Sequence, residues 1–284
     1  AARELGLSNA SVSKHVRQLE ERLGVTLLHR TTRRVTLTAT GEAYLGRCAR
    51  LLDDLEELDQ AVAQSTTSIQ GKLRVNVPNA FGLLHVSPLL ADLLAAWPEL
   101  TIEMTMSDRF VDLIEEGVDV AIRIAAALPD STTLVAKRIA GADQITCATP
   151  RYLRAHGTPR SPGDLVDHRC LIHGIGRRPW VFTRGDETVA VRPDACLQVD
   201  NSLALRDALL AHAGITVTPA FYVHELVQTG KLRVLCPQWA APRVWIHAVY
   251  PSHRHLSARV RAFVDHVSEH IRSAPWAIGV AERA

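Results

Sequence analysis

The sequence predicts an α/β protein with an N-terminal part that is rich in α-helix. Three observations predict this class. The chain begins with a helix-turn-helix pattern beside basic residues, continues through a proline-free heptad of apolar residues, and ends in a long region where strand and helix patterns alternate. With 284 residues, 47% of them hydrophobic and 22% charged, the chain has room for roughly two or three domains.

The first 38 residues predict two helices that cross at a tight turn. Ala2 is small enough for a close crossing, Gly6 can take the backbone shape of the turn, and Val12 fills the space between the helices. Ser8 is expected to cap the second helix, because its hydroxyl can accept an unpaired backbone N–H of the first turn.

The second helix has one apolar and one polar face. Val12, Val16, Leu19 and Leu23 recur at helical spacing, and short hydrogen-bonding and basic side chains occupy the other side. Such a face suits base edges and phosphates. An ordinary amphipathic surface helix remains an equal alternative when this helix is taken alone.

Residues 25–38 form two short β-prone pieces around a basic tip, as in a wing. Residues 1–38 hold seven Lys or Arg against three Asp or Glu, whereas residues 39–70 hold two against six, and the whole chain has a net charge of only +2. This local basic charge suits phosphate contacts that weaken with salt. The expected DNA contacts are Ser8, Asn9, Ser11, Ser13, Lys14, Arg17, Arg30, Thr31, Arg33 and Arg34.

Residues 39–65 are expected to form a linker helix that pairs with a second copy of itself. The apolar seam consists of Tyr44, Cys48, Leu51, Leu55, Leu58 and Val62, and Leu45 and Leu52 widen it. A helix of about 26 residues is roughly 39 Å long, too long to hide against a small winged domain. The seam therefore predicts a homodimer, and packing on the chain's own second domain is the alternative.

Residues 66–71 are expected to be a hinge, and the region from 72 to 273 to be a two-lobed domain, with a tail over 274–284. Strand and helix patterns alternate, which predicts a parallel sheet in each lobe. Lobe I is expected at about 72–147 and 248–273, with strands at 72–77, 100–106 and 118–122 and helices from 79 to 97, 108 to 117 and 257 to 273. Lobe II is expected at about 148–247, with helices at 150–156 and 201–213, the latter closed by Gly214, and strands near 170–173, 180–183 and 215–219.

The order of these motifs resembles the LysR-type transcriptional regulators. The resemblance is carried by Leu19-Glu20-Glu21-Arg22-Leu23-Gly24-Val25, then Leu28-His29-Arg30, then Leu37-Thr38-Ala39-Thr40-Gly41, over residues 1 to about 65. Residues 72–273 resemble the periplasmic-binding-protein-like effector domain of that family. The family has a further helix before the point where this chain begins, so residue 1 is expected to lie inside a truncated winged helix-turn-helix domain.

The resemblance implies a regulator that binds a near-palindromic operator in double-stranded DNA, as a homodimer or homotetramer, under the control of a small-molecule effector, with possible contact to RNA polymerase. Effector binding is expected to shift the angle between lobes and subunits and so to change DNA bending. A solute-binding receptor without a DNA role is the alternative, and a catalytic α/β protein is a more distant one. No common catalytic motif is visible, so the chain is not expected to be an enzyme.

The effector is expected beyond the carboxyl ends of the strands, where helix N-termini expose N–H groups. These places are Asn79, Ala80, Phe81 and Gly82 in one lobe and Asp200, Asn201 and Ser202 in the other; the resemblance adds Ser107, Arg123, Thr146, Ala148 and Thr218. Arg123 is the expected carboxylate anchor, because its planar fork can hold two oxygens, and a structural ion pair is an equal alternative. Asp200 would favour a polar or mixed-charge ligand.

No cofactor or metal is expected. Five widely spaced cysteines predict neither a disulfide framework nor a thiolate zinc site, and each is expected to be buried. His266 and His270 flank the buried face of the last helix and lack further ligands, and Gly174-Ile175-Gly176 lacks the third glycine of a dinucleotide fingerprint. No run approaches a membrane span, so no membrane partner is expected and the cytoplasm is the expected compartment.

Overall fold

The computed structural model describes residues 8–30, 35–62, 69–174, 179–252 and 257–278. The chain divides into two compact units, residues 1–67 and 68–284. Of the residues expected in the helix-turn-helix and the wing, Ala2, Gly6, Thr31, Arg33 and Arg34 lie outside the described residues.

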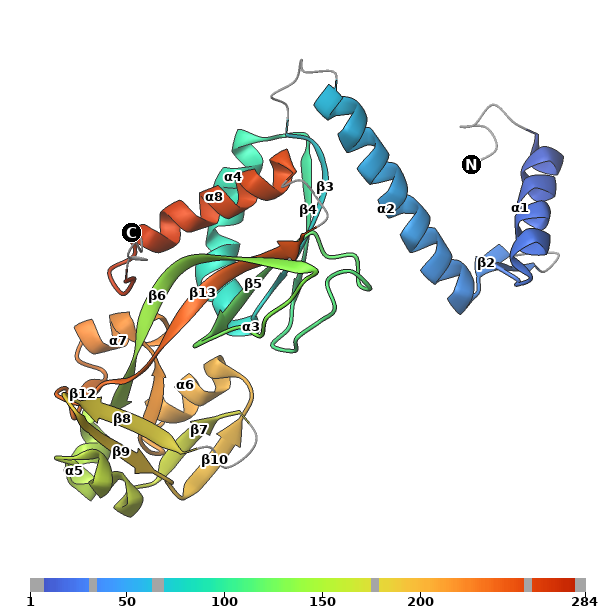
Figure 1. Ribbon diagram of the computed structural model, residues 1–284. Coiled ribbons are helices and arrows are strands. Elements are labelled where there is room, and N and C mark those ends of the chain that lie inside the picture. The colour runs from blue at the N-terminus through green and yellow to red at the C-terminus, as the bar shows by residue number, and fades with distance from the viewer. Residues whose placement is uncertain (1–7, 31–34, 63–68, 175–178, 253–256, 279–284) are drawn as a thin grey trace. The chain divides into compact units, whose positions relative to one another are not determined.

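The first unit contains the expected second helix, the wing strands and the linker helix (Figure 1), namely α1 (Asn9–Leu23), β1 (Leu28–Arg30), β2 (Val35–Leu37) and α2 (Ala39–Val62). The predicted cap is confirmed, since the Ser8 hydroxyl accepts the Ser11 N–H at 3.1 Å. Gly24 ends α1 in the left-handed conformation, with φ of 68°, which favours glycine. Strands β1 and β2 pair antiparallel, with Leu28 opposite Leu37.

Hydrogen bonds connect the start of α2 to the residues just before β1. The Thr38 N–H donates to the Leu27 carbonyl at 2.9 Å, and the Thr38 hydroxyl donates to the Thr26 carbonyl at 2.8 Å and accepts the Gly41 N–H at 2.9 Å. A β-carbon on Gly41 would lie 2.0 Å from the Leu27 carbonyl oxygen. Only glycine therefore lets this turn of α2 approach the wing so closely.

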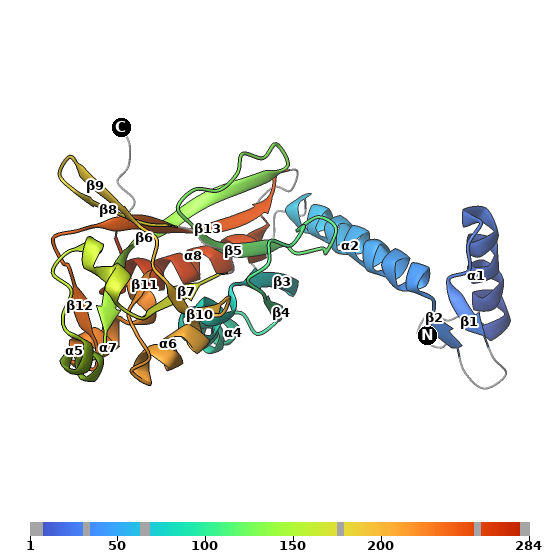
Figure 2. The same ribbon diagram turned by 90° about the horizontal axis from the view of Figure 1, so that it is seen from below.

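The second unit is organised by one seven-stranded sheet that extends through both lobes (Figures 1 and 2), in the order β11-β6-β13-β5-β3-β4, with β12 also paired to β6. Its strands are β3 (Gly71–Val77), β4 (Leu100–Met106), β5 (Val120–Ala125), β6 (Leu134–Ala148), β11 (Thr216–Pro219), β12 (Arg233–Leu235) and β13 (Ala241–Pro251).

Within the seven-stranded sheet, the expectation of parallel pairing is wrong outside β3, β4 and β5, whereas in lobe II the strands β7 (Cys170–His173) and β10 (Ala195–Val199) do pair parallel. Strand β3 pairs parallel with β4 and β5, but β13 lies antiparallel to both β5 and β6. The reason is the path of the chain, which leaves lobe I along β6 and returns along β13. The two crossings between the lobes are thus long neighbouring strands.

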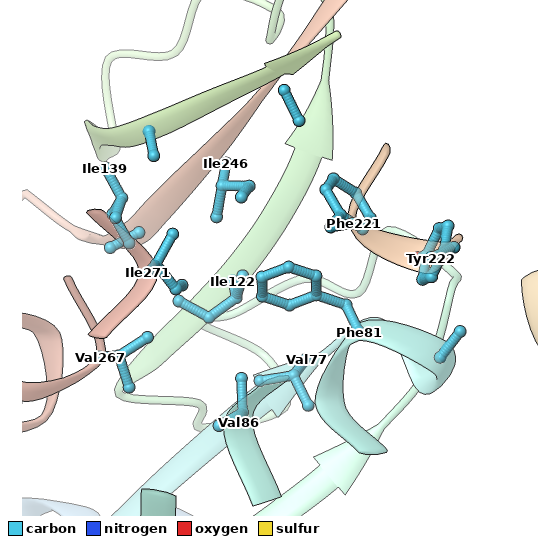
Figure 3. Close-up of a cluster of buried hydrophobic side chains, with 14 of the residues drawn as sticks. Val77, Phe81, Val86, Ile122, Ile139, Phe221, Tyr222, Ile246, Val267 and Ile271 are labelled. Carbon is cyan, nitrogen blue, oxygen red and sulfur yellow. The ribbon is translucent and has the colours of Figure 1, made fainter. Parts of the chain in front are cut away.

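Lobe I buries its main core between this sheet and the helices on one face (Figure 3). These helical segments are α3 (Asn79–Phe81), a π-helical turn (Gly82–Val86), a 3-10 turn (Ser87–Leu89), α4 (Leu90–Ala96) and α8 (Ala258–Ser273). Phe81 and Val86 pack beside Ile122 of β5, and Val267 of α8 joins the same cluster.

The run Asn79–Ala96 is, among the described residues, long and apolar enough to cross a membrane by length and composition. This corrects the expectation that no run approaches such a length. Phe81, Val86 and Leu93 of the run are fully buried in the core of lobe I, and the need to fill that core accounts for their apolar character.

Lobe II adds small layers around the far end of β6. They consist of α5 (Pro150–His156), a 3-10 turn (Pro162–Asp167), β7 (Cys170–His173), β8 (Trp180–Arg184), β9 (Glu187–Val191), β10 (Ala195–Val199), α6 (Ser202–Leu210), a 3-10 turn (Ala220–Tyr222) and α7 (His224–Gln228). That second 3-10 turn also packs against lobe I, because the Phe221 ring lies 5.2 Å from Phe81 in an edge-to-face pair. The lobes therefore share a core beside the two crossing strands.

Two sequence expectations for helices are corrected. Helix α6 ends at Leu210, before Gly214, and His212 takes the left-handed conformation with φ of 65°. Gly214 is needed for another reason, since a β-carbon there would lie 2.3 Å from the Arg169 carbonyl oxygen. No helix forms over residues 108–117: the Asp112 carboxylate accepts the Ile114 and Glu115 N–H groups and holds a single turn instead.

Candidate functional sites

The basic and polar face of α1 is open to solvent in the first unit. Ser13, Lys14 and Arg17 are exposed, and Ser11 is half-buried. The Ser8 hydroxyl already accepts the Ser11 N–H as the helix cap. Its expected contribution to DNA binding is therefore to fix the start of α1. The side chain of Asn9 is outside the described residues.

Glu20 of α1 binds the backbone at the start of the wing, a contact that the sequence did not predict. Its carboxylate accepts the Leu27 and Leu28 N–H groups at 2.8 and 3.0 Å and lies 3.8 Å from the Arg30 guanidinium. The two backbone hydrogen bonds, with help from Arg30, lower the pKa of this carboxyl below its ordinary value. Arg30 is thereby held at the base of the wing. The signal in the sequence is the acidic pair Glu20-Glu21 in the last turn of a helix whose other charged residues are basic.

The linker helix exposes the apolar side chains of its expected seam. Leu51 and Leu55 are 69% and 54% exposed, and the flanking Leu45 and Leu52 are exposed by similar amounts. Tyr44 and Cys48 are half-buried. Leu58 and Val62 belong to the described helix, but their side chains lie outside the description.

A cavity of about 240 Å³ lies between the lobes of the second unit. It brings together four of the expected effector residues, namely Ser107, Arg123, Ser202 and Thr218. The other lining residues are Pro78, Asp108, Arg109, Phe110, Ile124, Gln144, His173, Val217, Pro219, Tyr222 and Val244. They come from the ends of β4, β5, β7 and β11, from the two crossing strands and from the start of α6, as expected of a site at the carboxyl ends of strands.

The structure does not bring the remaining expected residues to the wall of this cavity. In lobe I, Ala80, Phe81 and Gly82 are buried, and a β-carbon on Gly82 would collide with Val77. Asn79 is half-buried, and its side-chain amide donates to the carboxylate of the lining residue Asp108 at 2.7 Å. It therefore orients a lining residue instead of lining the cavity itself.

The expected residues Asp200 and Asn201 of lobe II and Thr146 and Ala148 of the crossing strand β6 also do not line the cavity. Thr146 and Ala148 are buried within β6, where they face Leu235 and Arg233 of β12 in the sheet register. Asn201 uses its side chain as the cap of α6, accepting the Leu203 and Ala204 N–H groups, and Asp200 precedes it outside the cavity wall. The carboxylate in the cavity is Asp108, so the expectation of mixed charge moves to a different residue.

Arg123 has one buried nitrogen without a hydrogen-bond partner. Its side chain is only 6% exposed, and its Nη1 donates to the Asn76 Oδ1 at 2.6 Å and to the Ile122 carbonyl at 3.1 Å. Its Nη2 is buried without a hydrogen-bond partner, and burial lowers the pKa of the guanidinium while the nearby Glu116 opposes that change. No described carboxylate forms an ion pair with it, so the structural ion pair is not what the described residues show.

His173, Gln144 and Tyr222 are three of the lining residues that the sequence did not predict. His173 is the last residue of β7, so the expectation of a site at the carboxyl ends of strands could have included it. Gln144 comes from the middle of β6, and Tyr222 comes from the 3-10 turn after β11. Burial raises the pKa of Tyr222 to about 12, so its hydroxyl stays protonated as a hydrogen-bond donor. No pattern in the sequence marks Gln144 or Tyr222.

The five cysteines differ in burial, and the paired histidines His266 and His270 both contact backbone carbonyls. Cys147, Cys170 and Cys236 are buried as expected, but Cys48 is half-buried and Cys196 is exposed, which corrects the expectation for those two. The His266 Nε2 lies 3.1 Å from the Leu89 carbonyl, and the His270 Nδ1 lies 2.9 Å from the His266 carbonyl, so both rings are engaged with backbone.

A winged helix-turn-helix unit joined by a long helix to a two-lobed α/β unit with a cavity between its lobes defines a class of ligand-responsive DNA-binding regulators. Comparison with known protein families supports this class for both parts of the chain. The family described as "LysR substrate binding domain" matches residues 66–272, and "Bacterial regulatory helix-turn-helix protein, lysR family" matches residues 1–42. The chain belongs to the LysR family of transcriptional regulators.

Individual relatives are similar over nearly the whole chain. The HTH-type transcriptional regulator PtxR of Pseudomonas aeruginosa is 35% identical over 284 residues, which cover 99% of this chain and 90% of that protein. DmlR of Escherichia coli K12 is 34% identical over 273 residues, covering 95% and 88%. Among solved structures, CrgA of Neisseria meningitidis has a TM-score of 0.66 with 30% identity, covering 94% of this chain and 91% of that one. The full-length structure of AphB, a virulence activator of Vibrio cholerae, has a TM-score of 0.64 with 25% identity, covering 95% and 92%.

Proposed function

We propose that this transcriptional regulator is controlled by a small anionic effector that binds between the lobes of its second unit, with Arg123 as the anchor. The observation that carries the proposal is the unpartnered Nη2 of a side chain that is 6% exposed and lines the cavity. An unsatisfied buried donor of this kind costs roughly 1–3 kcal/mol, a cost that an anionic oxygen would remove. Arg109 and His173 add positive or donor groups to the same cavity, while Asp108 adds one carboxylate.

The proposed DNA-reading surface consists of the exposed residues of α1 and the base of the wing. Lys14 and Arg17 are exposed on one helix, and Glu20 holds Arg30 beside it. This arrangement fits a recognition helix in the major groove with the wing against the backbone. The other proposed contacts, as expected from the sequence, are Ser8, Asn9, Ser11, Ser13, Thr31, Arg33 and Arg34.

We further propose that α2 pairs two copies of the chain. The support is the exposure of Leu51 and Leu55 along a seam with a spacing of three and four residues, because such a row loses solvent contact only against a partner. A dimer places two reading helices on one operator, which is therefore proposed to be near-palindromic. Contact with RNA polymerase and a cytoplasmic location complete the proposal for a regulator of this family, and no catalytic role is proposed.

The DNA-reading surface is tested by selecting bound fragments from a genomic library with the full chain and measuring their affinity by fluorescence anisotropy. We expect Lys14→Ala with Arg17→Ala to weaken binding of the selected fragment by tenfold or more and to reduce its salt dependence. Arg22→Ala removes an exposed positive charge from the same helix outside the proposed surface, and we expect it to change the affinity little. Equal losses in the two proteins would refute the assignment.

The pairing surface is tested by analytical ultracentrifugation of the full chain. We expect Leu51→Glu with Leu55→Glu to convert a dimer or tetramer into smaller species, because two charges would face each other across the seam. Ala43→Glu, an exposed position off the seam on the same helix, is the matched control and should leave the mass unchanged. A wild-type protein that is monomeric at micromolar concentration would overturn the proposal.

A further inference from the structure

A second hollow in lobe I borders the proposed effector site. It has a volume of about 310 Å³ and is walled by Leu113, Leu128, Leu134, Ala136 and Val249. It lies over the sheet face opposite the main core, where Leu113, Val249 and their neighbours form a small cluster of their own. The walls are apolar side chains from β6 and β13 and from the segments before and after β5.

Arg123 and Phe110 line both this hollow and the cavity between the lobes. The Phe110 ring lies 5.7 Å from the Arg123 Cζ and remains 70% exposed. A ligand bound to the free Nη2 of Arg123 would therefore have apolar walls on one side and the polar cavity on the other. A third hollow, on the lobe II side of the cavity, does not include Arg123 among its lining residues.

Charge decides which end of a ligand this hollow accepts. Its charged lining residues are Arg123 and Asp130, and Asp130 is exposed, so water can solvate its carboxylate. Arg123 is buried with a free nitrogen, and its interaction with an anion is not screened in this way. The wall formed by Leu113, Leu128, Leu134, Ala136 and Val249 offers only apolar side chains and would exclude a second charge, while Asp130 and Ser131 lie at exposed positions.

The volumes of the two hollows also favour a ligand that occupies both. The cavity between the lobes, at about 240 Å³, is smaller than the roughly 300–1,000 Å³ of usual small-molecule sites. With the adjoining hollow it reaches that range. A ligand that filled both would also cover the exposed ring of Phe110.

We propose that the effector is a small monoanion with an apolar group, such as an aryl or branched alkyl carboxylate, whose carboxylate binds Arg123 and whose apolar group enters the hollow under Phe110. This inference rests on the proposed function, because it takes the same arginine as the anchor. It adds the class of ligand and assigns Phe110, Leu128 and Ala136 as residues that determine specificity.

The test compares three probes with the full chain by ligand-detected NMR titration, which reads millimolar affinities. Acetate carries only the charged group, 2-phenylethanol only the ring, and phenylacetate both. We expect phenylacetate to bind about tenfold or more tighter than acetate, because its ring leaves water. We expect 2-phenylethanol to bind more weakly than phenylacetate, because it lacks the charge.

Variants locate the two parts of the ligand. Ala136→Phe fills the hollow from an exposed position and should abolish the advantage of phenylacetate over acetate, leaving acetate binding unchanged. Val135→Phe, also exposed on β6 but not in the wall of the hollow, is the matched control and should preserve the advantage. Arg123→Gln should weaken both anions, and Arg123→Lys should restore part of the affinity; circular dichroism spectra that match the wild type show that each variant folds.

The outcomes separate this inference from the proposed function. If acetate binding depends on Arg123 but phenylacetate binds no tighter, or if Ala136→Phe leaves the ratio of the two affinities unchanged, the proposed anchor stands and the apolar subsite is overturned. If Arg123→Gln changes the binding of neither anion, or if neither anion binds the wild type, both proposals fail.

Discussion

The tight approach of α2 to the wing at Gly41 makes a sharp prediction about stability. A β-carbon on Gly41 would lie 2.0 Å from the Leu27 carbonyl oxygen and 2.9 Å from the Leu27 carbonyl carbon. Contacts under 3.0 Å are essentially never made by real β-carbons, and the atoms met here are backbone. Gly41→Ala must therefore move the helix away from Leu27 by about an ångström, because neither partner can rotate aside.

The magnitude follows from what that movement breaks. The shift would stretch the bonds that Thr38 makes to Thr26 and Leu27 and would open the packing around the buried Leu27 side chain. Overpacking of this kind costs about 1–3 kcal/mol, against a gain of roughly 0.5–1 kcal/mol from replacing glycine inside a helix. We expect a net loss of about 1–2 kcal/mol in the local stability of the first unit.

Gly46→Ala is the matched control on the same helix, because a β-carbon there meets nothing within 4 Å. It should stabilise α2 by roughly 0.5–1 kcal/mol through the helix propensity alone. The assay is hydrogen–deuterium exchange of peptides that cover residues 26–30 and 36–45, which reports the first unit separately from the second. Exchange in Gly41→Ala that is no faster than in the wild type, or as slow as in Gly46→Ala, would refute the reasoning.

Two further predictions concern the second unit. Burial lowers the pKa of His85, whose Nε2 lies 3.0 Å from the Phe221 carbonyl, and burial, with Arg138, lowers the pKa of His247. The unfolded chain then binds protons that the folded one does not, so the free energy of unfolding should fall as the pH drops below about 6.5, by at most about 1.4 kcal/mol per pH unit for each ring. Urea titrations from pH 8 to 5.5 measure this slope, His85→Gln should flatten it, and a slope that the variant leaves unchanged would exclude His85 as a source. Asn201→Ala removes the cap of α6 and should lower the free energy of unfolding, measured by thermal denaturation, by about 1 kcal/mol. Asn201→Asp keeps an oxygen that can accept the Leu203 and Ala204 N–H groups and should retain most of the stability. Equal losses in the two variants would show that these capping hydrogen bonds do not stabilise the protein.

The shared core of the two lobes bears on how an effector could act. The Phe221 ring and carbonyl of lobe II contact Phe81 and His85 of lobe I, so the lobes are joined by packing as well as by β6 and β13. A change in the angle between the lobes would have to break or slide this contact. The aromatic contact, as well as the crossing strands, therefore sets the cost of such a movement.

The sequence alone determined the local elements of this protein. The cap at Ser8, the linker helix from residue 39 and the strand at residues 100–106 follow from interactions between residues close in the chain. Hydrophobic periodicity also identified the buried face of α8, including Val264 and Val267.

Only the tertiary structure decided how distant segments meet. The antiparallel place of β13 between β5 and β6 and the close contact of Gly214 with Arg169 depend on partners that local patterns do not reveal. The cavity shows the same division. The family resemblance pointed to Arg123, which lies within β5. Its unpartnered nitrogen and its place between two hollows depend on side chains that meet only in the packed chain, because burial and hydrogen-bond satisfaction are properties of the folded protein.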